Sequence, residues 1–276
     1  MIGKTQEAAG KLRALHTAGV LILPNAWDAG SAAVIAQAGA QAIATTSGGI
    51  SWSAGQADGQ RLTRAEMTAR IREIAAAVSV PVTADIEGGY GASPADVALT
   101  VAEVIAVGAA GVNIEDSRMP GGPLYTIAEQ AGRIRAARES AASAGLPELF
   151  INVRTDLFLY SIGPAETRLD EVRARCIAYA AAGADGLFVP GLTSLPVITE
   201  LAGASPLPLN VMAGPGAPPI AELAAAGAKR ISTGTAITQA AYALAGRAAT
   251  ELLTKGTYIE MEEALDFGTI NNLLAR

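Results

Sequence analysis

Short apolar runs alternate with alanine-rich stretches along most of the chain. The segments 39–46, 108–115, 183–190 and 227–234 each follow an alanine-rich stretch and open on a glycine that leads into an apolar run. A glycine commonly ends a helix in left-handed backbone, and a short apolar run is typical of a buried strand. These four segments therefore predict four helix-to-strand junctions.

A second kind of strand start lies between these junctions. Val80-Pro81-Val82, Leu146-Pro147-Glu148 and Leu207-Pro208-Leu209 place a proline just before an apolar run, where its missing N–H does least harm to a sheet. With a first strand at 20–23, strands are predicted near residues 20, 42, 82, 112, 150, 187, 209 and 230, with helical patterns between them. Eight alternating strands and helices predict a closed parallel (β/α)8 barrel, an α/β fold.

An open doubly wound sheet is the alternative, but no Gly-x-Gly-x-x-Gly opens a helix after any of these strands. Residues 4–19 predict an extra helix that covers the bottom of the barrel. The pattern places the eighth helix at about 235–253 and a last helix at 270–274. We therefore expect one domain over residues 1–276, with 235–276 forming the eighth and terminal helices. Apolar side chains in 256–276 predict burial against a partner subunit.

Composition narrows the class of protein. Half of the 276 residues are hydrophobic and the net charge is −6, which argues against nucleic acid or an anionic membrane as the main partner. No apolar run reaches the ~20 residues needed to cross a bilayer, and the expected location is the cytoplasm. The single cysteine, Cys176, and single histidine, His16, exclude a disulfide framework and a histidine-rich metal site. Both are predicted to be structural.

Polar residues interrupt three consecutive predicted strands at their carboxyl ends. They form pairs two positions apart: Asp85 and Glu87, Asn113 and Glu115, Asn152 and Arg154. Side chains two apart on a strand share a face, and the carboxyl ends of barrel strands carry the chemistry of this fold. Three carboxylates and one guanidinium are therefore expected at one rim.

Such a cluster of anions is costly unless a cation is present. Oxygen ligands without histidine or cysteine suit Mg²⁺, with Mn²⁺ as a second possibility. Ser47-Gly48-Gly49, directly after a predicted strand, offers a hydroxyl and open backbone N–H groups, which suit a carboxylate or phosphate.

Several of these segments together resemble the isocitrate lyase/phosphoenolpyruvate mutase superfamily. The matching elements are Pro24–Ser31, Thr46-Ser47-Gly48-Gly49, Asp58-Gly59, Thr83–Gly91, Asn113–Asp116 and Arg154-Thr155-Asp156. The resemblance covers nearly the whole chain, to about residue 250. The more specific elements are Asp-x-Glu-x-Gly-Tyr-Gly, which reads Asp85-Ile86-Glu87-Gly88-Gly89-Tyr90-Gly91 here, and Ile-Glu-Asp.

The resemblance implies a barrel whose last helix swaps between subunits, in dimers that pair into tetramers. It also implies Mg²⁺ bound by Asp85, with water ligands held by Asp58, Glu87 and Glu115. A 2-oxo acid would place its carboxylate on Thr46, Ser47, Gly48 and Gly49 and its keto oxygen on Arg154. By the same analogy, Asn210 would help to hold the rest of the substrate.

The chain departs from the family pattern where the reaction is decided. Lyases carry a Lys-Lys/Arg-Cys-Gly-His segment in the loop after the fourth strand, whereas this loop, 116–124, contains no cysteine, lysine or histidine. The Asn or Thr of phosphonate-processing members is missing there too. At the end of the sixth strand, Val189-Pro190-Gly191 replaces the glutamate of 2-methylisocitrate lyases. Isocitrate-type cleavage and phosphoryl mutation are therefore disfavoured.

The residues expected to bind the metal are all present despite these departures. The sequence therefore favours a Mg²⁺-dependent enzyme that cleaves a carbon–carbon bond of an oxaloacetate-like 2-oxo acid through an enolate. Decarboxylation, hydrolysis and retro-aldol cleavage all fit. Tyr90 and Arg118 are the candidates for contacting the leaving fragment or delivering a proton, with Glu115 and Arg154 as the other catalytic residues. Alternatives are a metal-dependent 2-oxo acid binder without turnover, a 2-methylisocitrate lyase, a phosphonopyruvate-processing enzyme and a ketopantoate hydroxymethyltransferase.

Overall fold

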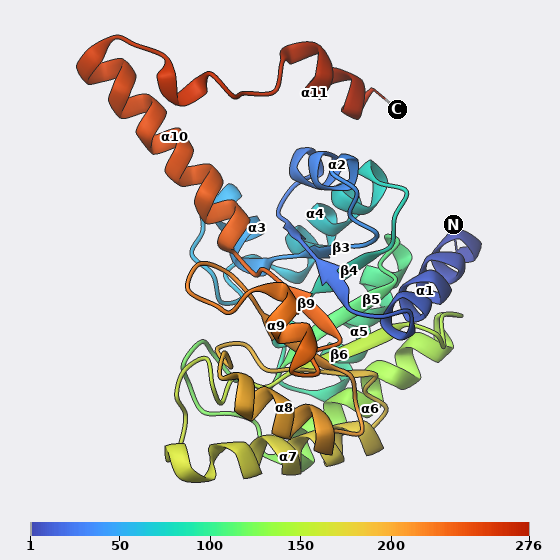
Figure 1. The fold of residues 1–276 in the computed structure, drawn as a ribbon. Helices are drawn as coiled ribbons and strands as arrows, with labels where there is room; N and C mark the ends of the chain where they lie inside the picture. The colour runs from blue at the N-terminus through green and yellow to red at the C-terminus, as the bar shows by residue number, and fades with distance from the viewer. Residues whose placement is uncertain (1, 276) are drawn as a thin grey trace.

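The computed structural model describes residues 2–275, and its strands form one parallel sheet (Figure 1). The sheet order is β1-β9-β8-β7-β6-β5-β4-β3-β2. The strands are β1 (Leu21–Leu23), β2 (Asn25–Ala26), β3 (Ile43–Thr45), β4 (Val82–Asp85), β5 (Gly111–Glu115), β6 (Phe150–Arg154), β7 (Gly186–Phe188), β8 (Leu209–Met212) and β9 (Arg230–Ser232). Each predicted strand position is occupied.

The first predicted strand is divided in two by Pro24. β1 pairs with β9 and β2 pairs with β3, so the two halves of this stretch join the ends of the sheet order. Proline has no N–H to offer a ladder, which is why pairing breaks at this residue. The predicted (β/α)8 barrel is thus confirmed, with eight staves built from nine short strands.

Helices surround the sheet. They are α2 (Ala29–Gln37), α4 (Arg64–Ala77), α5 (Pro94–Ala106), α6 (Ile127–Ser143), α7 (Ala165–Ala181), α8 (Leu195–Ala204), α9 (Ile220–Ala225) and α10 (Ala236–Lys255), with a short additional helix α3 (Ser47–Ser53) after β3. No helix within residues 2–275 is long and apolar enough to span a membrane. Cys176, on α7, is 1% exposed and its Sγ lies 3.2 Å from the Ser205 Oγ, as expected for a structural residue.

The extra helix α1 (Ile2–Thr17) closes the bottom of the barrel, where the strands begin. Leu12 is fully buried there, and the His16 ring stacks on Phe150 with 3.8 Å between centroids. Phe150 is the first residue of β6, so His16 lies at the opposite end of the barrel from the strands' carboxyl ends. Burial lowers the pKa of His16 to about 4, and the ring is neutral at pH 7.

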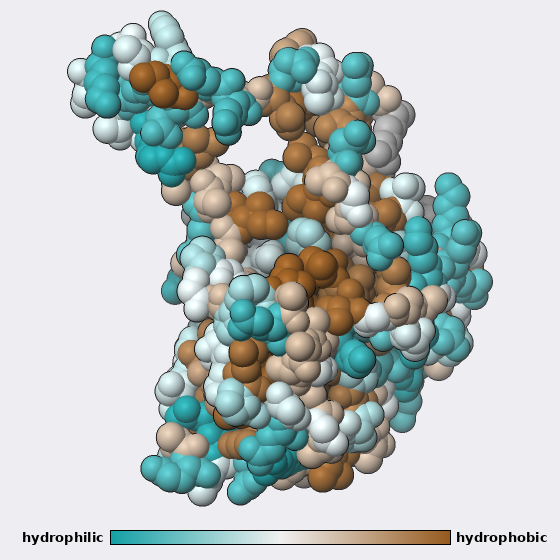
Figure 2. Space-filling view, viewed as in Figure 1, coloured by the Kyte–Doolittle hydropathy of each residue, from teal (hydrophilic) through white to brown (hydrophobic). Residues whose placement is uncertain are grey.

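The chain ends in an arm that leaves the barrel. α10 projects outward, and the chain returns through η1 (Ile259–Met261) to α11 (Phe267–Leu274), which contacts α2 (Figure 1). Figure 2 shows open space between this arm and the barrel, with hydrophobic side chains on the arm. Leu253 is 87% exposed and Phe267 is 82% exposed. The arm therefore carries an apolar surface that this single chain does not cover.

Candidate active site at the carboxyl ends of the strands

The barrel interior is layered, because side chains two apart on each strand point the same way. Below the rim lies a polar layer in which the Asn152 Nδ2 donates to the Oδ1 of Asn113 (2.9 Å) and of Asn210 (3.0 Å). Arg230 is also buried in this layer and donates to Asn113. The Asn210 amide nitrogen donates to carbonyls of β8 and β9. Asn210 is thus a fully bonded interior residue, and the structure does not bring it together with the rim carboxylates.

The rim layer holds the predicted charged residues. Asp85 ends β4, Glu115 ends β5 and Arg154 ends β6, and Glu115 and Arg154 are register partners. The Arg154 Nη1 lies 3.0 Å from the Glu115 Oε2. Burial raises the pKa of Glu115, while Arg154 acts against that rise. Burial would lower the pKa of Arg154, but the surrounding carboxylates outweigh it and the guanidinium stays charged.

Asp58, in the loop between α3 and α4, lies close to Asp85 at the end of β4. The Ser47 N–H donates to the Asp85 Oδ2 at 3.2 Å, and an added Cβ at Gly48 would lie 3.3 Å from the Asp58 Oδ2. The pKa of Asp58 is raised, first by burial and then by the charge of Asp85. The structure therefore brings Asp58, Asp85, Glu87, Glu115 and Arg154 to one end of the barrel.

Three hydrogen bonds join Glu87, Tyr90 and Gln60. The Tyr90 hydroxyl donates to the Glu87 Oε1 (2.9 Å), the Gln60 N–H donates to its Oε2 (2.5 Å), and the Tyr90 N–H donates to the Gln60 Oε1 (2.9 Å). These three residues have φ of 48° to 55°, left-handed backbone that costs non-glycine residues about 1–3 kcal/mol each. Such strain clusters at functional sites. Burial, then Asp85, raises the pKa of Glu87 to about 7.

These carboxylates fit a hard divalent cation that keeps most of its water. Within residues 2–275, no three acidic, histidine or cysteine side chains form a ready-made metal cage. Mg²⁺ is commonly bound through one or two carboxylates and retains several waters, so a cage is not required. Burial and mutual repulsion raise the pKa of both Asp58 and Glu87, and a cation among them would relieve that repulsion.

The predicted carboxylate-binding segment forms the first turn of α3. Thr46 is the N-cap, and its Oγ1 lies 3.5 Å from the Gly49 N–H. A Cβ added at Gly48 would lie 2.9 Å from the Thr235 side chain, and Gly49 is more tightly enclosed. Ser47, Gly48 and Gly49 are all buried beside Asp85. The segment therefore combines close packing with backbone N–H groups near the carboxylates.

We predict that Gly49→Ala destabilises the protein by about 1–3 kcal/mol, because its Cβ would lie 2.7 Å from atoms of Thr46 and Thr238. The matched control is Gly10→Ala on the exposed face of α1, where nothing lies within 4 Å. That change should stabilise by about 0.5–1 kcal/mol, since alanine favours a helix. Urea unfolding measures both, and equal midpoints for the two variants would contradict the prediction.

Arg118 lies outside this group. Its Nη2 is 2.7 Å from the Glu129 Oε1, and its guanidinium stacks over the Tyr125 ring. Glu129 belongs to the first turn of α6, where a carboxylate caps the helix and attracts the arginine. The structure thus brings together Tyr90 and Glu87, whereas Arg118 faces a helix end.

Two residues at the site were not assigned a role from the sequence. Asp156 accepts from the Arg154 Nε at 2.6 Å and is completely buried. Its position two residues after Arg154 was a usable signal, because such residues share a face. Arg133 on α6 donates to the carbonyls of Gly88, Gly91 and Ala92, and so clamps the loop after β4. A contact from a helix forty residues away leaves no local sequence signal.

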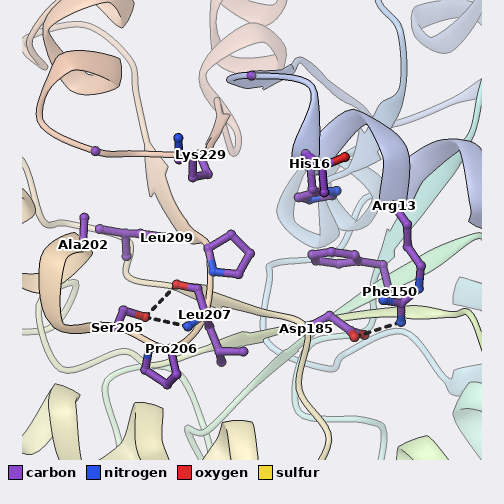
Figure 3. Close-up of a pocket in the computed structure, with 14 residues that line it drawn as sticks. Arg13, His16, Phe150, Asp185, Ala202, Ser205, Pro206, Leu207, Leu209 and Lys229 are labelled. Atoms are coloured by element: carbon purple, nitrogen blue, oxygen red, sulfur yellow. Dashed lines mark hydrogen bonds and ion pairs between the residues drawn. The ribbon is translucent and has the colours of Figure 1, made fainter.

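A cavity of about 670 Å³ lies at the opposite end of the barrel, between α1 and the turns before β8 and β9 (Figure 3). Arg13, His16, Phe150 and Lys229 line it, and the Arg13 guanidinium is paired with Asp185 at 2.8 Å. None of the rim carboxylates reaches it. Barrel enzymes work at the carboxyl ends of their strands, so the candidate active site is the rim and not this cavity.

Comparison with known proteins agrees with the geometry. The phosphoenolpyruvate phosphomutase family model matches residues 12–253. An uncharacterised protein of Mycobacterium tuberculosis is 37% identical over 80% of each chain. An oxaloacetate decarboxylase of Rhodopseudomonas palustris is 36% identical over 58% of this chain and 54% of its own.

Among solved structures, oxaloacetate acetylhydrolase with its product oxalate superposes with a TM-score of 0.86, at 25% identity, covering 97% of this chain and 94% of the other. The region that matches the family model, residues 12–253, contains every barrel strand and every rim residue described above. The chain is therefore a member of the phosphoenolpyruvate mutase/isocitrate lyase superfamily, a superfamily of lyases and mutases.

Proposed function

We propose that this protein is a Mg²⁺-dependent enzyme that cleaves a carbon–carbon bond of an oxaloacetate-like 2-oxo acid through an enolate. The observation that carries the proposal is Arg154, held between Glu115 and Asp156 beside a cluster of buried carboxylates. A fixed cation next to a site that fits a divalent cation suits charge that develops on a keto oxygen. The oxaloacetate enzymes among the relatives support this choice of substrate.

The residues have separate tasks in this scheme. Asp85 would bind Mg²⁺ directly, and Asp58, Glu87 and Glu115 would hold its water ligands. The bound ion would supply positive charge that polarises the 2-oxo acid. The segment Thr46-Ser47-Gly48-Gly49 would receive the substrate carboxylate, and Arg154 would donate to the keto oxygen as negative charge grows on it.

Proton delivery falls to Tyr90 in this proposal. The loop after β5 has no cysteine, lysine or histidine, so the acid of the lyase members is missing. The Tyr90 hydroxyl lies 2.9 Å from the Glu87 Oε1, and burial followed by the charge of Glu87 raises its pKa. Tyr90 therefore stays protonated at neutral pH. Decarboxylation needs only a late proton on the enolate carbon, so it tolerates the missing acid best.

A substrate panel tests the proposal. Oxaloacetate and substituted malates are incubated with the protein and Mg²⁺, with and without EDTA, and pyruvate, oxalate and acetate are quantified. From oxaloacetate, pyruvate and CO2 formed faster than in a protein-free Mg²⁺ control indicate decarboxylation, and oxalate with acetate indicates hydrolysis. Pyruvate and a second carboxylic acid from a substituted malate indicate retro-aldol cleavage. Calorimetric binding of 2-oxo acids without any product would instead favour the non-catalytic binder, which the acid-free loop after β5 also permits.

Assembly is the second part of the proposal. The arm formed by α10, η1 and α11 exposes Leu253, Tyr258, Ile259 and Phe267 by 65% or more. Exposed apolar surface of this kind marks an interaction site. A second copy of the chain, exchanging the arm, is the proposed occupant, in dimers or tetramers.

We predict that light scattering at low micromolar concentration gives the mass of a dimer or tetramer. Deleting residues 257–276 should reduce the number of subunits in the assembly. The deletion removes Tyr258, Ile259 and Phe267 from the arm but leaves α10 and the barrel. The control is Leu99→Ser, which removes an exposed apolar side chain on α5 and should leave the mass unchanged. A monomeric full-length chain would contradict this part of the proposal.

A further inference from the structure

The loop between β5 and α6 is a small antiparallel hairpin, residues 117–124, which we call the rim hairpin. Ser117 and Leu124 form an antiparallel bridge, and the Arg118 N–H donates to the Pro123 carbonyl at 3.0 Å. Below the bridge, the Tyr125 N–H donates to the Asp116 carbonyl at 2.8 Å. Backbone hydrogen bonds therefore hold the two sides of the hairpin together as one unit.

The tip of the rim hairpin reaches over the rim. An added Cβ at Gly59 would lie 2.8 Å from the Pro120 ring, and one at Gly121 would lie 3.7 Å from the Tyr160 ring. Gly59 directly follows Asp58 in the chain, and Tyr160 lies in the loop after β6. The rim hairpin thus rests on loops from two sides of the candidate active site.

One carboxylate joins the base of this hairpin to Arg154. The Asp156 Oδ1 accepts from the Arg154 Nε at 2.6 Å, and its Oδ2 accepts from the Ser117 Oγ at 2.5 Å. Asp156 is fully buried and Ser117 is 1% exposed. A buried carboxylate bonded on both oxygens has one favourable orientation. Loss of either partner would remove the restraint that fixes this orientation.

The backbone on this side is anchored from α7. The Asp156 N–H donates to the Asp116 Oδ1 at 3.1 Å, and the Asp116 Oδ2 accepts from Arg175 and Tyr179. Asp116 immediately precedes Ser117, so both ends of the Ser117–Asp156 bond start from fixed backbone. The bond therefore links two fixed segments of backbone, and it can transmit the position of the hairpin base to the carboxylate.

We propose that Ser117 is a positioning residue that couples the rim hairpin to Arg154 through Asp156. With the hydroxyl present, Asp156 presents one oxygen to each partner, and the guanidinium keeps its contact with Glu115. Without it, Asp156 turns both oxygens to Arg154, draws the guanidinium away from Glu115 and releases the hairpin base. The coupling follows from the contacts alone; its importance for turnover rests on the proposed function.

Hydrogen exchange of the peptide spanning 117–125 tests the coupling without any activity. Ser117→Ala should exchange about five- to tenfold faster there, because a buried acceptor loses its donor. Ser117→Thr keeps a hydroxyl and should stay close to the parent. Ser140→Ala is the control, since it removes a hydroxyl that bonds the Ala98 carbonyl on the outer helices. Unchanged exchange in Ser117→Ala, or equal acceleration by Ser140→Ala, would overturn the proposal.

A second variant probes the far end of the coupling. Arg154→Lys keeps the charge but loses the fork that bonds Glu115 and Asp156 together, and it should also accelerate exchange in 117–125. The Arg154 carbonyl also accepts from the Asp116 N–H at the base of the hairpin (3.1 Å), but the substitution leaves that backbone bond in place. Among the described residues, the Arg154 side chain is linked to the rim hairpin through Asp156, so unchanged exchange in this variant would refute the coupling.

Where the parent turns over a 2-oxo acid, Ser117→Ala should raise KM about five- to tenfold and change kcat less than threefold, because the guanidinium is displaced but still present. Ser117→Thr should restore KM. Absence of turnover in the parent would reject the proposed function, and the exchange experiment would still decide the coupling.

Discussion

Asp85→Ala is expected to reduce Mg²⁺-dependent turnover by at least about 10³-fold, roughly 4 kcal/mol of barrier. Asp85 is the proposed direct ligand of the ion, and its carboxylate also accepts from the N–H groups of Ser47 and Glu87. Its removal therefore affects both metal affinity and the placement of the segment that receives the substrate carboxylate. Initial rates with the substrate identified by the panel, measured across a Mg²⁺ titration, provide the test.

The variant should remain folded. The charge of Asp85 raises the pKa of Asp58 and of Glu87, so its loss removes repulsion from the cluster. Asp170→Asn is the control, because Asp170 is a mostly exposed carboxylate that pairs with Arg173 in its own helix. It should retain parent activity. Turnover in Asp85→Ala within tenfold of the parent would remove Asp85 from the metal site.

Arg154→Met is expected to lower kcat by about 10²–10³-fold, the usual cost of removing one preorganised donor from a developing oxyanion. It should also destabilise the fold by about 3–5 kcal/mol at neutral pH, because Glu115 and Asp156 lose a buried partner. Arg70→Met is the control: Arg70 forms an exposed pair with Glu73, and such pairs contribute little. A kcat within threefold of the parent would exclude Arg154 from the reaction.

The pH dependence gives this variant a distinct signature. Burial raises the pKa of Glu115 even with Arg154 present, and loss of the guanidinium raises it further. A carboxyl with a raised pKa in the folded state favours folding while protonated, and that contribution is lost as pH rises through the folded pKa. The destabilisation of Arg154→Met should therefore be smaller at pH 5 than at pH 8. Urea midpoints at the two pH values measure it.

The barrel was predictable because each stave carries its own signal. A glycine or proline marks the start of most strands, and an apolar run follows it, so local chemistry sufficed to count eight staves. The break at Pro24 was visible as a residue, but the pairing of its two sides with different neighbours depends on closure of the sheet. Closure is a property of the whole chain.

The candidate site was predictable where strands place it. Asp85, Glu115 and Arg154 end consecutive strands, so alternation alone brought them together. Alternation did not predict the contacts of Arg118 with a helix N-terminus or of Asn210 with a polar interior layer. The substrate-contacting roles of both residues stay predictions. The hydrogen bonds among Gln60, Glu87 and Tyr90 depend on left-handed loop backbone that no local sequence pattern indicates.

A crystal grown with Mn²⁺ and examined by anomalous scattering tests the central claim most directly. The proposal predicts one strong peak per chain at the rim, about 2.1 Å from an oxygen of Asp85. Asp58, Glu87 and Glu115 should lie one water further out. Absence of a peak among these carboxylates at millimolar Mn²⁺, or a peak held by other residues of the barrel, would contradict it.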